Sequence, residues 1–441
     1  MNRLWMRITI GLFVGFFFLL PLPVQAWKNH TLMTWAVFQG WDGLQETVTA
    51  EPLEVFLARE KDKIGTLLQS EEEWAKTHIH AYPPRPPELD FITSQEKDLR
   101  LRFLRALRLN PEMKLPLYVM LLPGLSAEEG KTISRSEVSV LSKDFEQRVY
   151  VKLSAGEKVK ALEVLATASD EPDNGLDIGL WEDNGTEFGR AYRYGKQPFG
   201  NPKLDYGTQA PFHMGFYHES GIVGKAAPSF LKTFPEQRVH LFQALARLAF
   251  QTGHPYWGYR FAGWGLHYLQ DITMPYHATI MPGRSTLTML SIALLDMIGI
   301  HGPKDSAVSE VSRAHIFIEK LLNQELHEAY RKNDQEAALF RALRDEKADK
   351  GYPAYFDRFL SQVAAKESRA ASKPLYKAVR AVITDKQGYK DIERVSEEGD
   401  YDARLYMAGA PEKAVQEYHR LIEERMRSFG AFSRIYLRSL R

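Results

Sequence analysis

The sequence predicts a mainly α-helical protein, and three observations lead to this fold class. Apolar residues recur at a helical period over several long stretches, most clearly 235–271, 306–344 and 410–439. No stretch alternates between apolar and polar residues strongly enough to predict a large sheet. The 441 residues are 44% hydrophobic and 26% charged, which is ordinary for a folded chain and excludes disorder of the whole protein.

The same period places the helices in chain order. They are predicted at 30–39, 51–75, 94–109, 155–168 and in the three stretches already named. The stretch 235–271 should form two helices, because Gly253 and Pro255 interrupt the helical pattern. Residues 81–87 (AYPPRPP) predict an extended connector. Residues 170–217 are rich in Gly, Asp and Pro and therefore predict loops.

Residues 1–26 have the pattern of a cleaved secretory signal peptide. Two arginines precede an uncharged apolar run, 8–20, and the sequence Val-Gln-Ala at 24–26 suits cleavage by a signal peptidase. A run of about 13 residues is short of the roughly 20 that span a bilayer, so an uncleaved membrane anchor is the alternative. We therefore expect an exported protein, periplasmic or secreted, whose mature chain begins at Trp27.

A second apolar run covers residues 287–300 (LTMLSIALLDMIGI). It is too short to span a bilayer and contains Asp296. It predicts a buried core helix, with a flap that touches a membrane as the alternative.

Composition narrows the kinds of site that the chain could build. It contains no cysteine, which excludes disulfides, thiolate zinc sites and iron–sulfur clusters. Any metal must therefore be held by His, Asp, Glu or backbone atoms. The 57 Lys and Arg residues nearly balance the 56 Asp and Glu residues, so there is no electrostatic footprint for duplex DNA or an anionic membrane.

The residues that carry chemistry are concentrated in GLHYLQDITMPYHA, residues 265–278. His267 and Asp271 are four residues apart, so on a helix they share one face, as two ligands of one metal do. Pro275 should end the helix and let His277 turn toward the same site. On their own, a histidine and an aspartate four residues apart would be read as an ordinary surface pair. The apolar, aromatic surroundings argue against a solvated face.

A second pair with this spacing, His315 and Glu319, lies in another apolar stretch, where an unpaired charge would be costly. His301 and Asp305 have the same spacing, but Pro303 lies between them, so we discount that pair.

These motifs resemble those of the bacterial zinc-dependent phospholipases C of the alpha-toxin type, which are related to the single-strand-specific zinc nucleases. The family's His-Tyr-x2-Asp-x3-Pro-x-His segment stands at 267–277 with every spacing kept. Its later His-x3-Glu matches His315 and Glu319, and its N-terminal Trp, followed by a His, matches Trp27 and His30. The resemblance covers 27–40 and 211–325. It implies a multi-helix domain over 27–441 with a trinuclear zinc cleft.

The resemblance also implies the ligands of three zinc ions. The first ion would be held by Asp173, His213, His267 and Asp271, the second by Trp27, His30 and a bridging Asp271, and the third by His277, His315 and Glu319. Asp173 and Asp271 would be catalytic. Asp170 and Asp177 remain alternatives to Asp173, and His218 remains an alternative to His213.

The chain departs from the family pattern in three places. Trp27 and His30 are closer together than the family's Trp and His. Insertions are predicted at about 81–154 and at about 280–310. Insertions near a cleft change access to it, so they affect which substrate can enter.

The predicted function is hydrolysis of a phosphodiester by zinc-activated water. A phospholipid-like substrate is favoured, because Met274-Pro275-Tyr276-His277 resembles the alpha-toxin branch and near-zero net charge suits nucleic acid poorly. Transient contact with a membrane surface is compatible with such a substrate, and no protein partner is predicted. The alternatives are a single-strand-specific zinc nuclease and a secreted helical protein that zinc stabilises without turnover.

Overall fold

The computed structural model describes residues 27, 29–141, 148–202, 204–398 and 401–440. The protein is mainly helical, with 61% helix and 3% strand, which confirms the predicted fold class. The predicted signal peptide, 1–26, lies outside the described residues. Within the described ranges, no helix combines the length and the apolar character needed to cross a membrane.

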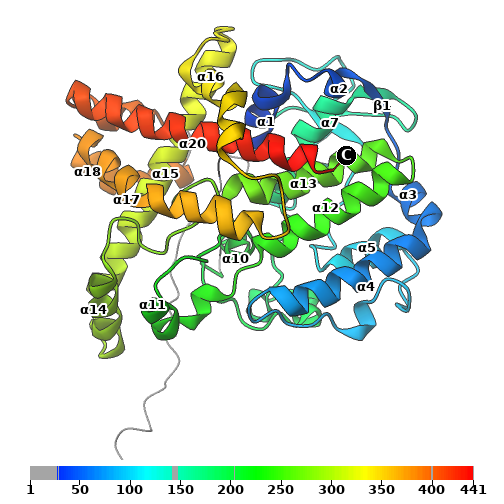
Figure 1. Cartoon of the computed structure of the whole chain (residues 1–441), viewed down its shortest axis with the longest axis horizontal. Coiled ribbons are helices and arrows are strands. Elements are labelled where there is room, and N and C mark those ends of the chain that lie inside the picture. Colours follow the sequence, from blue (N-terminus) through cyan, green and yellow to red (C-terminus); the bar gives the residue numbers. More distant parts are fainter. Residues whose placement is uncertain (1–26, 28, 142–147, 203, 399–400, 441) are drawn as a thin grey trace, which may run out of the picture.

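Apart from α4 (Lys61–His78), the helices of the first half of the chain are short, and the second half contains most of the long ones (Figure 1). The α-helices are α1 (His30–Phe38), α2 (Asp42–Gln45), α3 (Leu53–Arg59), α4 (Lys61–His78), α5 (Leu99–Leu107), α6 (Arg135–Val138), α7 (Ala161–Ala168), α8 (Glu187–Tyr192), α9 (Asp205–Thr208), α10 (Ala210–His213), α11 (Gly221–Ala226), α12 (Pro235–Gln251), α13 (Pro255–Asp271), α14 (Thr286–Met297), α15 (Gly302–Arg331), α16 (Ala338–Arg344), α17 (Ala365–Val382), α18 (Lys386–Lys390), α19 (Ile392–Glu398) and α20 (Glu412–Arg438). Short 3-10 or π segments are η1 (Pro87–Leu89), η2 (Pro172–Asn174), η3 (Glu182–Asn184), η4 (Pro228–Leu231), η5 (Glu346–Gly351), η6 (Leu360–Ala364) and η7 (Ala403–Met407).

The described strands form two small antiparallel pairs and no large sheet. Strand β1 (Thr47–Thr49) pairs with β4 (Lys158–Lys160), and β2 (Tyr118–Met120) pairs with β3 (Tyr150–Lys152). The helix predicted over 155–168 was therefore wrong in its first part. Val159 is buried between two exposed lysines, and this alternation lets 158–160 pair as a strand before α7 begins.

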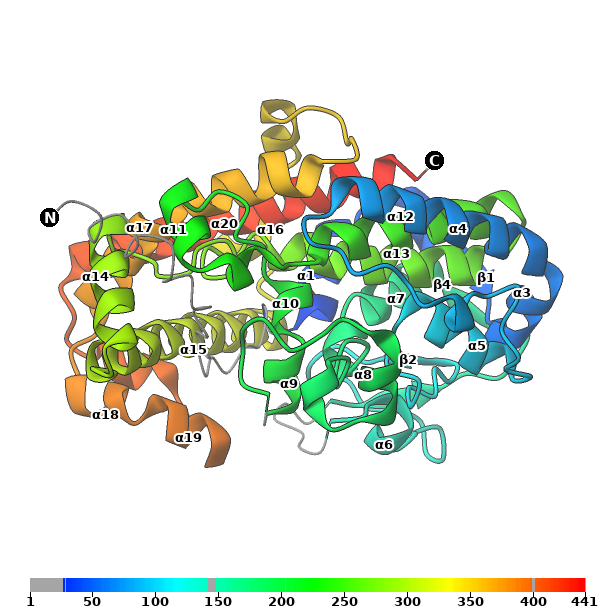
Figure 2. The same ribbon diagram turned by 90° about the horizontal axis from the view of Figure 1, so that it is seen from below.

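Helix α13 lies at the centre of the fold, against α12, α7 and α20 (Figures 1 and 2). It follows α12 after the break predicted at Gly253, which adopts a φ of +83°, and at Pro255, which stands in the first turn of α13. Every residue from 260 to 282 is buried. A helix that is apolar on most sides belongs in a core, so its polar groups face partners rather than water.

Gly263 sets how closely α7 approaches α13. A Cβ atom at this position would lie 2.6 Å from Cβ of Ala168 and 2.8 Å from the carbonyl oxygen of Leu165. Only glycine avoids this clash, because it lacks the Cβ atom. The close approach brings the end of α7, and the turn after it, against the polar residues of α13.

The prediction that residues 287–300 form a buried core helix was wrong. Residues 287–297 belong to α14 and Ile298 caps its C-terminus, but the side chains of Leu287, Leu294 and Ile298 are 79%, 59% and 66% exposed. Only Ile292 and Ala293 of this helix are buried. An apolar run indicates a helix but not the presence of a covering partner, and among the described elements α14 packs mainly against α15 and α11.

Candidate metal centre

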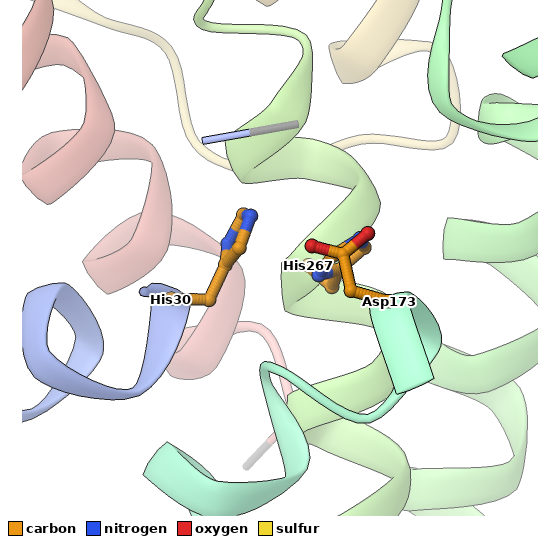
Figure 3. A group of neighbouring side chains, drawn as sticks. All are labelled: His30, Asp173 and His267. Atoms are coloured by element: carbon orange, nitrogen blue, oxygen red, sulfur yellow. The ribbon is translucent and has the colours of Figure 1, made fainter. Parts of the chain in front are cut away.

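Four separate segments bring their polar side chains to one side of α13. His30 begins α1, Asp173 lies in the single turn η2, His213 ends α10, and His267 and Asp271 lie one turn apart on α13. Figure 3 shows His30, Asp173 and His267 converging from three of these elements. All five are buried except Asp173, whose side chain is 18% exposed. Asp173 is therefore the member of this group that faces solvent.

The carboxylate of Asp271 lies between two sets of histidines. Its Oδ1 atom is 3.1 Å from Nε2 of His30. Its Oδ2 atom is 2.8 Å from Nδ1 of His213 and 3.2 Å from Nε2 of His267. Because each oxygen faces a different set, this carboxylate has the placement of a bridge between two neighbouring ions.

The spacing of the potential ligand atoms around Asp271 fits a tetrahedral metal. Nitrogen and oxygen ligands at about 2.0–2.2 Å from a tetrahedral zinc lie about 3.3–3.6 Å from one another. Nε2 of His267 is 3.1 Å from Nδ1 of His213. Oδ1 of Asp173 is 3.9 Å from that Nδ1 and 3.7 Å from that Nε2. Together with the two contacts to Oδ2 of Asp271, these distances scatter around the expected value.

Each of three histidines has one ring nitrogen held by a backbone carbonyl or an amide side chain that is not a candidate ligand atom. Nδ1 of His267 lies 2.8 Å from the carbonyl oxygen of Ser169, and Nδ1 of His30 lies 2.8 Å from Oε1 of Gln270. Nδ1 of His277 lies 3.0 Å from the carbonyl oxygen of His213. With Nδ1 as the donor, loss of the proton on Nε2 leaves a lone pair there for a metal ion. This is how protein sites fix the tautomer of a metal-binding histidine.

A second group lies beside the first. His277, His315 and Glu319 place their ligand atoms within 4.8 Å of one another, and all three are buried. Nε2 of His315 is 2.8 Å from Oε1 of Glu319, one turn further along α15. The rings of His277 and His315 are nearly perpendicular, with centroids 5.0 Å apart. The fold thus joins residues that the sequence separates by an entire helix, α14.

Trp27 also lies near these groups. Its side chain is fully buried, and its indole Nε1 donates to Oγ1 of Thr273 at 2.9 Å. Thr273 follows Asp271 in the turn that ends α13, so the start of the predicted mature chain is anchored beside the motif.

The histidines and the carboxylate of Asp271 shift one another's pKa values. Burial alone would lower the pKa of His30, but the hydrogen bond and charge of Asp271 outweigh it and raise that pKa to about 9. Burial is likewise outweighed at His213, where hydrogen bonds to Asp177 and Asp271 raise the pKa to about 10. Burial would raise the pKa of Asp271, but the charge of His267 and its histidine hydrogen bonds hold it well below its usual range. In His277, burial dominates and lowers the pKa to about 3.

Buried polar atoms without hydrogen bonds also indicate that these residues could hold a metal ion. Nε2 of His277 is buried and has no hydrogen-bond partner among the described residues. Nε2 of His30 and Oδ1 of Asp271 also lack a hydrogen bond of good geometry there, although they face each other. Buried polar atoms without partners are costly, and a bound ion would satisfy them. The protein therefore has buried His, Asp and Glu clusters that could bind metal ions.

The alternative ligands lie elsewhere or have other partners. Asp170 is 3.1 Å from Oγ1 of Thr31 and 3.0 Å from a guanidinium nitrogen of Arg148. His218 is outside the cluster, with Nε2 2.7 Å from the carbonyl oxygen of Ser361.

Asp177 pairs with Arg238 at 2.7 Å and accepts a 2.5 Å hydrogen bond from the Tyr268 hydroxyl. Its Oδ2 atom lies 3.5 Å from Nε2 of His213. It therefore stands behind that ring as an orienting carboxylate.

Sequence reasoning missed the residues that position the others. Gln270 lies inside the motif, and its burial among apolar neighbours was a usable signal. Its amide nitrogen donates to Thr34 and to Ser433 of α20, which aims its oxygen at His30. Gln209 donates to Oδ1 of Asp173 at 3.2 Å, and the Ser169 carbonyl meets His267. No local pattern identifies these last two.

Comparison of the chain with family models, with curated proteins and with solved structures gave no significant match.

Proposed function

We propose that this protein is an exported zinc-dependent phosphodiester hydrolase of the phospholipase C type. The observation that carries the proposal is the shared carboxylate of Asp271, with His30 on one oxygen and both His213 and His267 on the other. The group formed by His277, His315 and Glu319 lies beside it. This ligand order along the chain is the one that the resemblance to the family implies.

Zinc is the metal that these groups favour. Imidazole nitrogens with carboxylate oxygens, and no sulfur, suit a zinc site that keeps positions open for water or substrate. When bound, zinc supplies an acidified water and a positive charge that stabilises a phosphodiester under attack. The chain's residues fix the ligands, exclude bulk water from the buried side and leave the side at Asp173 open to solvent.

We assign Asp173 the role of proton acceptor. It is the exposed member of the first group, so an incoming water can reach its carboxylate. Gln209 donates to Oδ1 and holds that oxygen near His267, which leaves Oδ2 for a hydrogen bond to water. A carboxylate within hydrogen-bond reach of the attacking water meets the geometric requirement for a general base.

A phospholipid is the proposed substrate. The Pro-Tyr-His ending of the motif resembles the alpha-toxin branch, and the net charge of +1 provides no long-range attraction for a polyanionic nucleic acid. A single-strand-specific nuclease and a non-catalytic zinc-binding protein are the alternatives. One experiment distinguishes the three functions.

The experiment uses the mature protein beginning at Trp27. Its zinc content is measured by plasma mass spectrometry, and hydrolysis is measured on dihexanoyl-phosphatidylcholine and on single-stranded DNA. We expect bound zinc and lipid hydrolysis that a chelator abolishes. DNA hydrolysis alone would identify a nuclease, and zinc without turnover would leave the non-catalytic reading. The variant Asp173→Asn tests the proposed proton acceptor. Asp62→Asn, at an exposed site on α4, is its control.

A further inference from the structure

Helix α14 turns an apolar face outward, where a surface helix normally carries polar residues. Leu287, Leu294 and Ile298 are spaced at i, i+7 and i+11, so they share one side of the helix, and all three are more than half exposed. Ile292 and Ala293, on the other side, are the buried ones. Met297 at the end of the helix and Ile300 just after it are also 47% and 49% exposed.

A neighbouring helix extends this surface. Helix α11 packs beside α14 at one end of the molecule, as Figures 1 and 2 both show. It contributes Ile222, whose side chain is 60% exposed. We call these six exposed apolar residues the apolar tip, and its members are Ile222, Leu287, Leu294, Met297, Ile298 and Ile300.

Few charged side chains lie within the apolar tip. The segments 220–226 and 284–304 contain a single carboxylate, Asp296. Its side chain is only 12% exposed, and it lies 2.8 Å from Nζ of Lys304 and 2.6 Å from Nδ1 of His301. Lys225 on α11 is exposed. The tip is thus apolar, the acid that it contains is paired, and its edge carries the exposed Lys225 on one helix and the exposed Asp305 at the start of α15.

We infer that the apolar tip docks on the surface of a phospholipid bilayer. Interfacial helices bury an apolar face about 5–10 Å into the boundary region, and the apolar face of α14, with Lys225 beside it to meet a lipid phosphate, suits this position. A second copy of the chain is a poorer occupant, because stable protein interfaces use roughly 20–30 residues a side. The α-helix has 12 residues and lies on the surface rather than spanning the bilayer.

The position of the tip in the chain connects it to the metal centre. Helix α14 is the link between His277 and His315, which belong to the same buried group. The loop after His277 is tied to the start of α11, since Glu219 accepts a 3.0 Å hydrogen bond from the backbone nitrogen of Ile280. Arg369 on α17 pairs with the other oxygen of Glu219 at 3.2 Å. Docking through α14 would therefore bring a lipid substrate to this centre, and in that sense the inference rests on the proposed function.

The test measures binding and turnover separately. The triple variant Leu287→Ser, Leu294→Ser and Ile298→Ser removes the face of α14. The matched control, Leu125→Ser, Phe356→Ser and Leu405→Ser, removes three exposed apolar side chains elsewhere. Binding is read by cosedimentation with vesicles of phosphatidylcholine and phosphatidylglycerol. Turnover is read on monomeric dihexanoyl-phosphatidylcholine, which needs no surface.

We expect the α14 variant to lose at least about tenfold in vesicle binding, while the control binds like the unchanged protein. Melting curves and turnover of the monomeric ester should stay the same in all three proteins. Failure of the unchanged protein to bind vesicles, or equal binding by the α14 variant, would overturn the inference. So would a dimer in sedimentation velocity that only this variant loses, because the occupant would then be a second copy. Vesicle binding without any ester hydrolysis would instead refute the proposed function and leave the docking surface standing.

Discussion

Nδ1 of His30 lies 2.8 Å from the amide oxygen of Gln270, across 240 residues of chain. The contact turns Nε2 of His30 toward Asp271, while Thr34 and Ser433 hold the amide in place. A polar residue that is not itself a predicted ligand thus decides which nitrogen of His30 is available.

Removing this acceptor should weaken one metal site. We expect Gln270→Leu to lower zinc affinity about 10–100-fold at the site containing His30, as loss of an orienting partner typically does. Competition with a fluorescent zinc chelator measures the change. The exposed Gln251 at the end of α12 provides the control, Gln251→Leu. Equal affinities in the two variants would show that His30 needs no such partner.

The shared carboxylate should be the most sensitive position. We expect Asp271→Asn to lose more zinc per molecule than any other single change. The carboxylate offers two charged oxygens, one to each ion, whereas an amide offers one neutral oxygen. Glu319→Gln, which alters only the second group, should lose about one ion. Plasma mass spectrometry of the dialysed proteins gives both counts. A loss in Asp271→Asn no larger than that in Glu319→Gln would contradict a bridging role.

Zinc loading should release protons. The raised pKa values of His30 and His213, about 9 and about 10, keep both rings protonated at pH 7 in the metal-free protein, whereas His277 is neutral there. A metal needs the deprotonated nitrogens, so binding should release about two protons at pH 7 and tighten as the pH rises toward 9. Calorimetric titrations in buffers of different ionisation enthalpy report the number directly. Identical heats in all buffers would argue that these rings are already neutral.

The N-terminus created by cleavage should complete a metal site. The α-amino group of Trp27 has a reference pKa near 7.7–8.0, so zinc can displace its proton, whereas an amide nitrogen at that position is a poor ligand. We expect protein that begins at Trp27 to hold more zinc, and to turn over faster, than protein with one extra Ala before it. Trimming the extra residue should restore both properties. Equal zinc content and equal rates in the two proteins would contradict this prediction. Trp27 would then be a core residue, held by its buried indole, and not a metal ligand.

Gly263 should affect the centre without touching it. Gly263→Ala places a methyl group 2.8 Å from the Leu165 carbonyl oxygen, so α7 must move away from α13. Overpacking of this kind costs about 1–3 kcal/mol, and it displaces Ser169 and Asp173, which follow α7. We expect a lower melting temperature together with a lower zinc content. In the control Gly302→Ala, the new methyl group has open space at the start of α15, and both properties should be unchanged.

The sequence is informative where a local pattern decides the outcome. Gly253 and Pro255 divide α12 from α13, and the four-residue spacing of His267 and Asp271 puts them on one face, because both effects act within a few turns of a helix. The contacts of Ser169 with His267 and of Gln209 with Asp173 depend on how distant segments pack, so no local pattern contains them. The exposure of Leu287 was missed for the same reason, since periodicity identifies a helix but not what covers it.

The carboxylate that His30 shares with the histidines of α10 and α13 also has a mechanical consequence. An ion held between His30 and Asp271 would act as a cross-link between chain segments about 240 residues apart. A link that closes so long a loop restricts the unfolded chain, and binding to the folded state alone adds stability with the logarithm of free metal concentration. The concentration of free metal ion would then contribute to the stability of this fold.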